Sequence, residues 1–493
     1  MDSFDLIVLG AGSAGFAAAR VAAVQLRAHV ALVDKGPLGG LCILAGCMPS
    51  KALLQSSNVA QLVRNAGEFG LRFEGMSLDF PAIMARKERF VREFADFRTE
   101  GIESLPHTEL ILGEACFLDP HTIKVGERTL TAPKVILATG SIPMVPPVPG
   151  LAEAGFIMSD QALSLPRCPD SLGIVGGGII ALELGQFYAR MGAKVTLIEA
   201  GPRLIPREDP DVSAVITQRL IRENVSVHTG VKPFCVESSG DRKWLCFECA
   251  DAGERIGVSE ILVATGRGPC IEGLDLEKAG VRMEGRRMVL DRCLRTSHPD
   301  ILAAGDVTGG SYLVHVAISD GELAARNALL GCAPSLAPEH LYVSAAFTEP
   351  NIARVGLSEG EAKQLGREVL VGRYSFADLG KAEILGETDG FVKMLADPRS
   401  GEILGLTIVG PQGAELIHEM SCAITFRATV EQFLRVPHIH PTLSEILTYP
   451  AEEILDQMRK RSRVQTTLFP SGYNDQEEAC ALETLEKKGF SAD

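Results

Sequence analysis

The stretch that decides the fold is DLIVLGAGSAGFAAAR, which runs from residue 5 to residue 20. An apolar run leads into a glycine-rich turn and then into an alanine-rich helical pattern, and the turn contains Gly10, Gly12 and Gly15. A second apolar run, HVALVD, ends at Asp34. The first glycine makes the turn, the second lets a pyrophosphate approach the backbone, and the third lets helix and strand pack closely. With the acid placed to accept hydrogen bonds from a ribose, this segment predicts a nucleotide site rather than a structural turn.

The same pattern returns in SLGIVGGGIIALELG, from residue 171 to residue 185. Its three positions are filled by Gly176, Gly178 and Ala181, and the next apolar run, KVTLIE, ends at Glu199. A carboxylate there accepts a hydrogen bond from the free 2′-hydroxyl of NAD and repels the 2′-phosphate of NADP. We therefore expect NADH to be preferred, the alternative being that Glu199 is only a solvated charge at a strand end.

Each copy also carries a later apolar run that ends in the same tripeptide. VILATG closes with Thr139 and Gly140, and ILVATG closes with Gly266. Two copies with matched anchors arise by chance far less easily than one. The sequence therefore predicts two dinucleotide sites.

The amino-acid composition limits the class of protein and the kinds of partner to be expected. The chain has 493 residues, of which 46% are apolar and 23% charged, as in a soluble globular protein of about three domains. Its net charge of −15, without a Lys/Arg-rich run, argues against a nucleic-acid partner. We see no signal peptide and no run of about 18 apolar residues, so we expect neither secretion nor a membrane span. We expect a cytoplasmic location.

The 50 glycines are about one residue in ten, above the ordinary share of about 7%. No Gly/Ser-rich linker accounts for them, and many fall in the turns just described. The glycine excess therefore indicates positions where the backbone closely approaches another group, such as a phosphate.

Two of the 12 cysteines form a pattern with chemistry. In GPLGGLCILAGCMPSK, Cys42 and Cys47 are separated by four residues, which is not the usual spacing of a metal pair, and we expect no metal site. An early helical turn would bring the sulfurs together, and a helix N-terminus favours a thiolate. The spacing alone leaves two interpretations open: the pair is either a redox-active dithiol or two structural cysteines. The other cysteines, Cys293 among them, show no partner pattern, and Cys480 lies in a polar tail.

The segment around these cysteines resembles the GG-T-C-x₄-G-C-x-P-S-K signature of the flavin-dependent pyridine nucleotide–disulfide oxidoreductases. Here it reads Gly39-Gly40-Leu41-Cys42, then Gly46-Cys47-Met48-Pro49-Ser50-Lys51. The resemblance implies that Cys42 and Cys47 form a redox-active disulfide. It also implies FAD at the first glycine-rich turn, with Gly40 and Lys51 beside it, and the nicotinamide dinucleotide at the second.

Further matches carry the resemblance over about residues 4 to 455. ILAAGDVTGG places Gly305 and Asp306 where the family's aspartate meets the FAD ribityl chain. The resemblance also pairs Lys51 with Glu183 beside the flavin. In PHIHPTLSE it makes His440 the base and Glu445 the group that orients it, with the histidine supplied by the partner subunit of a homodimer. His438 and His315 are expected to have structural or packing roles.

The expected fold class is α/β, with two Rossmann-like dinucleotide-binding domains and a C-terminal α+β dimerisation domain. We expect an FAD domain at 1–149 and 267–340, interrupted by an NAD domain at 150–266. The dimerisation domain is expected at 341–462, and a polar tail at 463–493.

The substrate is the most open prediction. Ile179 and the segment from residue 390 to residue 419 look most like dihydrolipoamide dehydrogenase, with a lipoyl domain of a 2-oxo acid dehydrogenase complex as partner. In that hypothesis a dithiol reduces the disulfide, and electrons pass through FAD to NAD⁺. The alternatives are a mercuric reductase, a small-disulfide reductase using NAD(P)H, and a non-catalytic FAD/NAD redox sensor. Leu41 in place of the usual Thr, and a proline at Pro450 expected to interrupt a helix, depart from the family pattern.

Overall fold

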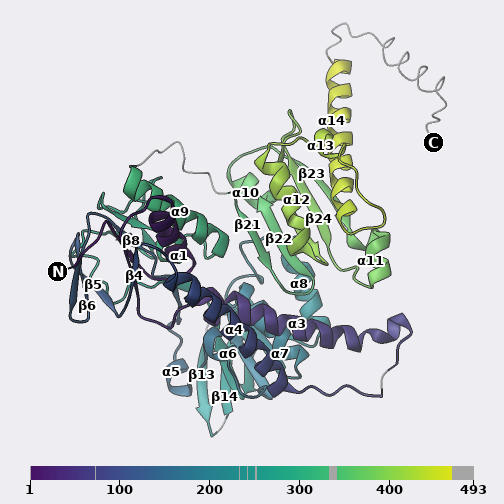
Figure 1. The fold of residues 1–493 in the computed structure, drawn as a ribbon. Helices are drawn as coiled ribbons and strands as arrows, with labels where there is room; N and C mark the ends of the chain where they lie inside the picture. The colour runs from purple at the N-terminus through teal and green to yellow at the C-terminus, as the bar shows by residue number, and fades with distance from the viewer. Residues whose placement is uncertain are drawn as a thin grey trace.

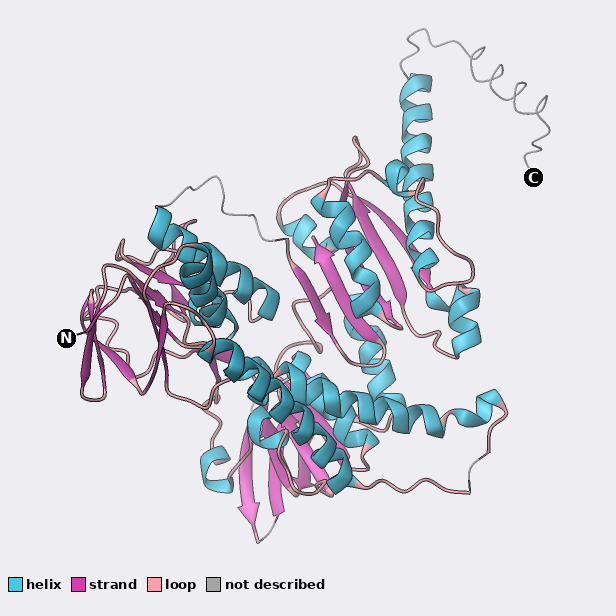
Figure 2. Cartoon of the chain, viewed as in Figure 1, coloured by secondary structure: helices cyan, strands magenta, loops and turns pink. Residues whose placement is uncertain are grey.

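The computed structural model describes residues 2–72, 74–231, 234–240, 242–249, 252–331 and 341–468. The chain forms three units, each built on its own sheet (Figure 1). Helices pack against each of these sheets, as the colouring by secondary structure shows (Figure 2). Cys480 and the tail beyond residue 468 lie outside the described residues.

The first unit is a parallel sheet of the doubly wound kind. In spatial order its strands are β20 (Ile301–Ala303), β8 (Val135–Leu137), β2 (Leu6–Leu9), β3 (Val30–Asp34) and β4 (Thr108–Leu112). All neighbouring pairs run parallel, and β2, β8 and β20 are fully buried, which suits their uninterrupted apolar sequences. The last strand of this sheet comes from a segment beyond residue 300, so the second unit is inserted into the first.

Helix α1 (Ser13–Arg20) begins directly after the glycine-rich turn and packs against α9 (Val314–Leu330). Gly10 has a φ of +104°, and a Cβ there would lie 2.3 Å from the carbonyl oxygen of Ala138. A Cβ on Gly15 would lie 1.7 Å from the carbonyl oxygen of Gly10. Both glycines are therefore dictated by backbone contact, and they bring the N-terminus of α1 close to the ends of β2 and β8.

Three helices lie between β3 and β4: α2 (Gly40–Ala45), α3 (Cys47–Arg64) and α4 (Phe80–Glu103). Helix α4 packs along α3 and also contacts α2 (Figure 1). The Asp79 side chain caps α4 by accepting a hydrogen bond from the Ala82 N–H at 2.9 Å. This excursion holds both cysteines of the sequence motif.

Smaller elements complete the first unit. One sheet consists of β1 (Asp2–Ser3), β7 (Arg128–Thr131), β6 (Thr122–Val125) and β5 (Ala115–Asp119). The connections to the second unit run side by side as the antiparallel pair β9 (Ser141–Pro143) and β17 (Arg267–Pro269). A short hairpin is formed by β18 (Met283–Glu284) and β19 (Arg287–Met288).

The second unit repeats the first in reduced form. Its parallel sheet consists of β12 (Ser226–Thr229), β11 (Lys194–Glu199), β10 (Ser171–Val175) and β16 (Glu260–Val263). Helix α7 (Ile179–Arg190) follows the second glycine-rich turn. The remaining elements are β13 (Phe234–Ser239), β14 (Arg242–Cys249), β15 (Ala252–Val258), α5 (Leu151–Ala154), α6 (Ser159–Ala162) and α8 (Pro210–Arg222).

The third unit is an antiparallel sheet with helices packed against it. The strands are β21 (Val343–Ala346), β22 (Asn351–Gly356), β25 (Ile403–Gly410), β24 (Phe391–Ala396) and β23 (Leu370–Ser375). The helices are α10 (Glu359–Gln364), α11 (Gly380–Leu385), α12 (Gly413–Thr425), α13 (Val430–Phe433) and α14 (Thr448–Leu468). Together the three units confirm the predicted fold class.

Two expectations need correction. Pro450 does not interrupt a helix, because α14 begins at Thr448 and the proline falls in its first turn, where a missing N–H costs no intrahelical hydrogen bond. Cys293, for which no partner pattern was visible, is disulfide-bonded.

A network of buried charges joins the second unit to the third. Arg190 is almost fully buried and contacts both Glu223 of its own unit and Glu349 of the third unit, at 2.7 and 2.6 Å. Nearby, Lys393 of β24 lies 2.7 Å from Asp209. A buried cation is stable only when paired, so these contacts fix how the two units meet. Among the described helices, none is both long and apolar enough to cross a bilayer.

The glycine turn yields a first testable expectation. Gly15→Ala places a methyl group against the Gly10 carbonyl, and we expect it to lower the free energy of unfolding by about 2–3 kcal/mol and to reduce bound FAD. Gly67→Ala is the matched control, since a Cβ at that exposed position meets nothing within 4 Å. Thermal unfolding and the flavin-to-protein absorbance ratio measure both effects. Equal stability of the two variants would show that the contact at Gly15 is unimportant.

Candidate functional site

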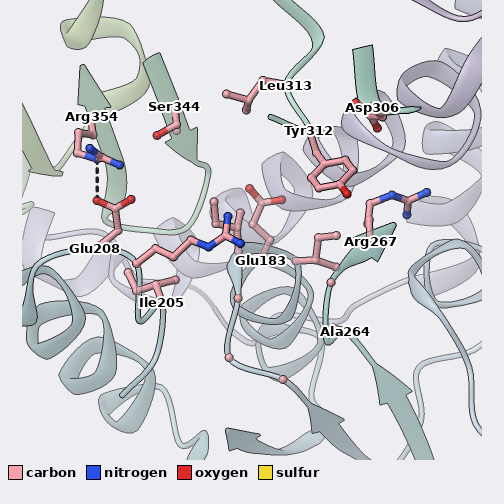
Figure 3. Close-up of a pocket in the computed structure, with 18 of the residues that line it drawn as sticks. Glu183, Ile205, Glu208, Ala264, Arg267, Asp306, Tyr312, Leu313, Ser344 and Arg354 are labelled. Atoms are coloured by element: carbon pink, nitrogen blue, oxygen red, sulfur yellow. Dashed lines mark ion pairs between the residues drawn. The ribbon is translucent and has the colours of Figure 1, made fainter. Parts of the chain in front are cut away.

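A cavity of about 2370 Å³ opens where the three units meet. Its walls come from both glycine-rich turns, the cysteine segment and strand β21. Figure 3 shows Glu183, Arg267, Asp306 and Tyr312 on one side of it and Arg354 and Ser344 on the other. The cavity is thus shared by elements that are far apart in the sequence.

The two predicted ribose acids are held in the same way. Asp34 accepts hydrogen bonds from the N–H groups of Ala11 and Gly36, both at 2.7 Å. Glu199 accepts them from the N–H groups of Gly177 at 2.6 Å and Gly201 at 2.5 Å. In each copy one bond comes from the glycine-rich turn and the other from two residues beyond the acid. The two copies therefore match in their three-dimensional structure as well as in their sequence.

The glycine-rich turns leave room for a phosphate. A Cβ on Gly178 would meet nothing within 4 Å, and one on Gly12 would meet only the Cα of Gly40, at 3.9 Å. Both glycines line the cavity. Arg203 lines it as well, and its Nε is buried without a hydrogen-bond partner in the described part of the chain. Open glycine turns and an unpaired guanidinium nitrogen fit two dinucleotides.

The other predicted cofactor residues fall into two groups. One group lines the cavity: Lys51, Gly140, Gly176, Glu199, Gly266 and Asp306. The other group is not part of the lining: Gly10, Gly15, Asp34, Gly40, Thr139 and Gly305. Gly40 belongs to the second group because of packing, since a Cβ there would lie 2.7 Å from the Cα of Gly12.

The redox candidates do not share one helix. Cys42 lies within α2, whereas Cys47 is the first residue of α3, and Gly46 turns the chain between them. Both are half-buried free thiols that line the cavity. The hydrogen bond from Cys42, with help from the Lys51 ammonium, lowers the pKa of Cys47 to about 7 against the effect of burial. The same hydrogen bond and burial raise the pKa of Cys42.

Lys51 and Glu183 form the expected ion pair, with Nζ 2.9 Å from Oε2. The Glu183 side chain is 5% exposed, and its Oε1 accepts a hydrogen bond from the Phe347 N–H at 2.8 Å. Lys51 Nζ also lies 4.6 Å from the centre of the Phe347 ring. Lys51, Glu183 and Phe347 belong to the first, second and third units, so all three units meet at this one carboxylate.

Asp306 lies in the first unit, where it lines the cavity. The Ser141 hydroxyl donates to its Oδ2 at 2.6 Å, and Arg267 Nε donates to the same hydroxyl at 2.9 Å. Burial raises the pKa of Asp306, and these contacts oppose the rise. Asp306 and Arg267 both face the cavity beside Tyr312 (Figure 3).

His440 and Glu445 lie apart from the cysteines of their own chain. His440 Nδ1 is 2.9 Å from Glu445 Oε2, but neither residue lines the cavity. The imidazole side chain is 78% exposed, whereas the carboxylate is 11% exposed. His438 has the expected structural contacts, to Glu419 and to the Val436 carbonyl. His315 is exposed and lines the cavity, so its side chain lies outside the buried core.

Comparison with known proteins names the family. The pyridine nucleotide-disulphide oxidoreductase model matches residues 4–321, and the model of that family's dimerisation domain matches residues 342–451. The chain belongs to this family. FAD and NAD(H) are its cofactors, as the sequence predicted.

Several relatives resemble the chain over most of its length. A dihydrolipoyl dehydrogenase of Thermus scotoductus is 37% identical over 465 residues, which is 93% of this chain and 98% of the relative. A mercuric reductase of Bacillus cereus is 34% identical over 443 residues, covering 90% of this chain and 70% of the relative. Among solved structures, the HOCl-induced flavoprotein disulfide reductase RclA of Escherichia coli superimposes with a TM-score of 0.81 at 26% identity. The superposition covers 92% of this chain and 100% of RclA.

Sequence reasoning missed several residues of the site. Ser141 and Arg267 belong to β9 and β17, and Phe347 follows β21. None of them lies in a motif whose spacing carries chemistry. Ser141 and Arg267 each come directly after one of the repeated ATG tripeptides, which is the local signal that could have found them, whereas only the folded chain brings Phe347 to Glu183.

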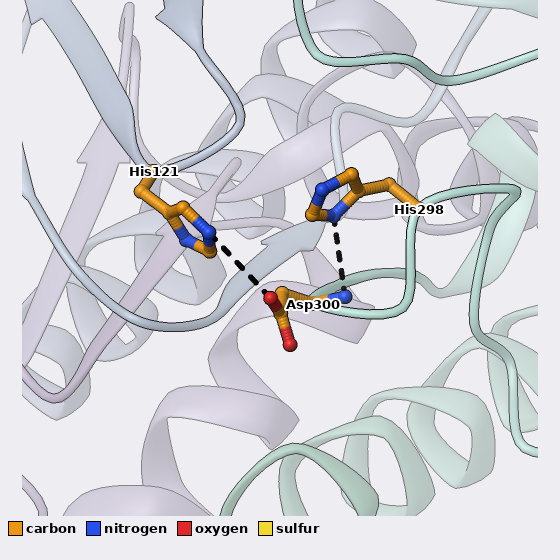
Figure 4. Close-up of side chains that lie close together, drawn as sticks. All are labelled: His121, His298 and Asp300. Atoms are coloured by element: carbon orange, nitrogen blue, oxygen red, sulfur yellow. Dashed lines mark hydrogen bonds and ion pairs between the residues drawn. The ribbon is translucent and has the colours of Figure 1, made fainter.

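One group of potential metal ligands lies away from the cavity. Figure 4 shows His121, His298 and Asp300 close together, with His121 Nε2 3.5 Å from Asp300 Oδ2. The other Asp300 oxygen is held by Lys134 at 2.5 Å, and His298 Nδ1 accepts the Asp300 N–H at 3.3 Å. The lysine neutralises the carboxylate, and the group acts as an ionic tie between the β5–β6 turn and the approach to β20.

The low pKa of Cys47 is directly measurable. In reduced, FAD-loaded protein we expect Cys47 alkylation to rise between about pH 6 and 8, because the thiol ionises near neutral pH. Cys42→Ala removes the hydrogen bond that lowers this pKa most, so alkylation of Cys47 at pH 7 should fall about tenfold. Peptide mass spectrometry after timed iodoacetamide treatment reports the rate at Cys47. Cys168→Ala, which removes a remote thiol, should leave the profile unchanged, and an unchanged profile in Cys42→Ala would refute the coupling.

Proposed function

We propose that this protein is an FAD-dependent, NAD-linked dithiol/disulfide oxidoreductase of the dihydrolipoyl dehydrogenase type. The observation that carries the proposal is the placement of Cys42 and Cys47 in the wall of a cavity that both glycine-rich turns share. One thiol of the pair has its pKa lowered and the other has its pKa raised. Such an asymmetric pair suits a dithiol in which one sulfur exchanges with substrate and the other is held as a thiolate.

FAD is assigned to the first unit. Gly10, Gly12 and Gly15 would shape the pyrophosphate turn, and Asp34 would hold the adenosine ribose. Gly40, Thr139, Gly140 and Gly305 would allow close backbone packing, and Asp306 would hold the ribityl hydroxyls. When bound, the flavin would supply a two-electron acceptor for the dithiol and a hydride donor for the nicotinamide. The Lys51 cation, paired with Glu183, would stabilise negative charge beside it.

NAD is assigned to the second unit. Gly176 and Gly178 would receive the pyrophosphate, with Gly266 at the end of the neighbouring strand. Glu199 lines the cavity, and its fixed carboxylate would accept a hydrogen bond from the ribose 2′-hydroxyl and repel a 2′-phosphate. This supports NADH over NADPH.

In the proposed thiol chemistry, Cys42 exchanges with the substrate and Cys47 is the leaving thiolate. In the oxidised enzyme a substrate thiolate attacks Cys42, forming a mixed disulfide and releasing Cys47 as a thiolate. The second substrate thiolate then attacks the substrate sulfur of that mixed disulfide. The substrate leaves as a cyclic disulfide, and Cys42 is freed as a thiolate that takes up a proton. The low pKa of Cys47 favours the first step, since a more acidic thiol leaves faster.

The proton carrier is assigned to a second copy of the chain. The exposed His440 ring is oriented by Glu445 and lies outside its own chain's cavity, so the partner subunit's His440 would serve as the base. Two exposed apolar side chains of the third unit, Ile439 next to His440 in the sequence and Phe426 at the end of α12, are 78% and 81% exposed and offer apolar surface that a homodimer would cover. The matched dimerisation domain supports the same assembly.

Dithiol oxidation is the first choice of reaction because dihydrolipoyl dehydrogenases recur among the relatives. The substrate would be a lipoyl group, including one carried by a lipoyl domain of a 2-oxo acid dehydrogenase complex. Mercuric ion reduction is the second candidate, favoured by the Bacillus cereus relative.

A substrate panel separates these possibilities. We expect NAD⁺ reduction by dihydrolipoamide to exceed NADH-dependent reduction of Hg²⁺, glutathione disulfide and coenzyme A disulfide by at least about tenfold in kcat/KM. NADPH in place of NADH should be poorer by a similar factor, because of Glu199. Stopped or continuous absorbance assays of NADH measure every arm. Dominant Hg²⁺ reduction would favour the second candidate, and no turnover in any arm would favour a redox sensor.

The shared site has its own test. Cys42→Ser and His440→Gln homodimers should each lose nearly all activity. When the two variants are co-expressed, half of the dimers are mixed, and each mixed dimer regains one intact site, so about a quarter of wild-type activity should return. Mixing Cys42→Ser with Cys47→Ser is the control, because no intact cysteine pair can form. Failure of the first mixture to recover activity would mean that each chain uses its own histidine.

A further inference from the structure

Arg98 of α4 is a half-buried cation without a counter-ion. Its Nη1 is inaccessible to solvent and has no hydrogen-bond partner in the described ranges. The guanidinium lies 4.5 Å from the centre of the Phe16 ring, which holds it in place against α1. Burial lowers the pKa of Arg98. Leaving a guanidinium nitrogen desolvated and unpaired costs free energy, and an anion close to it would offset that cost.

The element beneath Arg98 carries such an anion. Helix α4 packs against α2, where Cys42 lies. Negative charge on Cys42 raises the pKa of Arg98 against the effect of burial, so the two groups lie within electrostatic reach. No carboxylate in the described structure is paired with Arg98. The thiolate of Cys42 is therefore the anion placed to compensate this cation.

Cys42 needs that compensation more than Cys47 does. Burial and the neighbouring Cys47 sulfur both oppose its ionisation and raise its pKa. The charged groups around it are Cys47 and Lys51 from α3 and Arg98 from α4. Lys51 is already paired with Glu183. Lys51 nevertheless lowers the pKa of Cys42, and Arg98 is a second neighbouring cation, one without a carboxylate partner in the described part of the chain.

We propose that Arg98 is a positioning residue that stabilises the Cys42 thiolate when this sulfur leaves the mixed disulfide. In that step the bond between Cys42 and the substrate sulfur breaks, the substrate disulfide closes, and the electron pair stays on Cys42. The guanidinium lies within electrostatic reach of the sulfur that gains this charge. The same contact would activate Cys42 as a nucleophile in the reverse direction. The inference rests on the proposed role of Cys42 as the sulfur that exchanges with substrate.

The test measures Cys42 itself and uses neither dithiol substrate nor NAD⁺. In FAD-loaded Cys47→Ser protein, Cys42 titrates without its coupled neighbour, and its iodoacetamide alkylation rate is followed by peptide mass spectrometry from about pH 6 to 10. Adding Arg98→Met keeps an apolar chain against Phe16 but removes the charge. We expect the rate at pH 7.5 to fall about three- to tenfold and the profile to move to higher pH. Adding Arg98→Lys should keep the rate within about twofold.

Matched controls separate charge from packing. Arg89→Met removes a charge from the same helix at a side chain that is 61% exposed, and it should leave the Cys42 profile unchanged. Arg98→Gln serves as the neutral variant if Arg98→Met fails to retain flavin. The proposal is overturned if neutral variants alkylate like the parent, or if Arg98→Lys slows as much as they do. Because no turnover is measured, this result stands apart from the substrate panel.

Discussion

The buried carboxylate of Glu183 is the contact on which the rest of the architecture depends. A carboxylate this far from water must be paired, and its partners come from the two other units: the Lys51 ammonium and the Phe347 N–H. Removing either partner would leave a charge or a donor unsatisfied at the centre of the molecule. The cavity therefore exists in its present form only while all three units are docked around this one group.

A second constraint places the cysteine segment. Because Gly40 and Gly12 touch backbone to backbone, α2 lies directly on the first phosphate-binding turn. Gly46 then lets the chain start a new helix at Cys47. The two sulfurs thus enter from different helices, in different electrostatic surroundings, and one of them is more acidic than the other. A single continuous helix would not separate their environments in this way.

Much of this was predictable from the sequence because the information was local. Glycine spacing, the apolar runs and the acids Asp34 and Glu199 lie within about 25 residues of one another in each copy, so the two-site fold could be predicted from the pattern alone. On the spacing of the cysteines alone, by contrast, a redox pair and a structural pair were equally open. Family resemblance resolved that choice, and it also supplied the roles of His440 and Lys51.

The parts that could not be predicted depend on distance along the chain. Phe347 contacts Glu183 only in the folded chain, and no local pattern predicts that contact. The exposure of His315 and the position of Pro450 in a first helical turn were not predicted for a related reason. A proline usually ends a helix, but it is tolerated where it falls in the first turn. A histidine in a helical segment is usually packed in the core, but it can be exposed where the helix borders a cavity. The exact start of the helix and the edge of the cavity decide the two cases, and neither can be located from the sequence.

The ionic contacts between the second and third units have a mechanical consequence. Arg190 and Lys393 each bind carboxylates across that boundary while almost excluded from water, so opening it would strand several charges at once. A hinge at this boundary is thereby locked. Opening this particular boundary is therefore a costly way for a bulky coenzyme to enter the cavity.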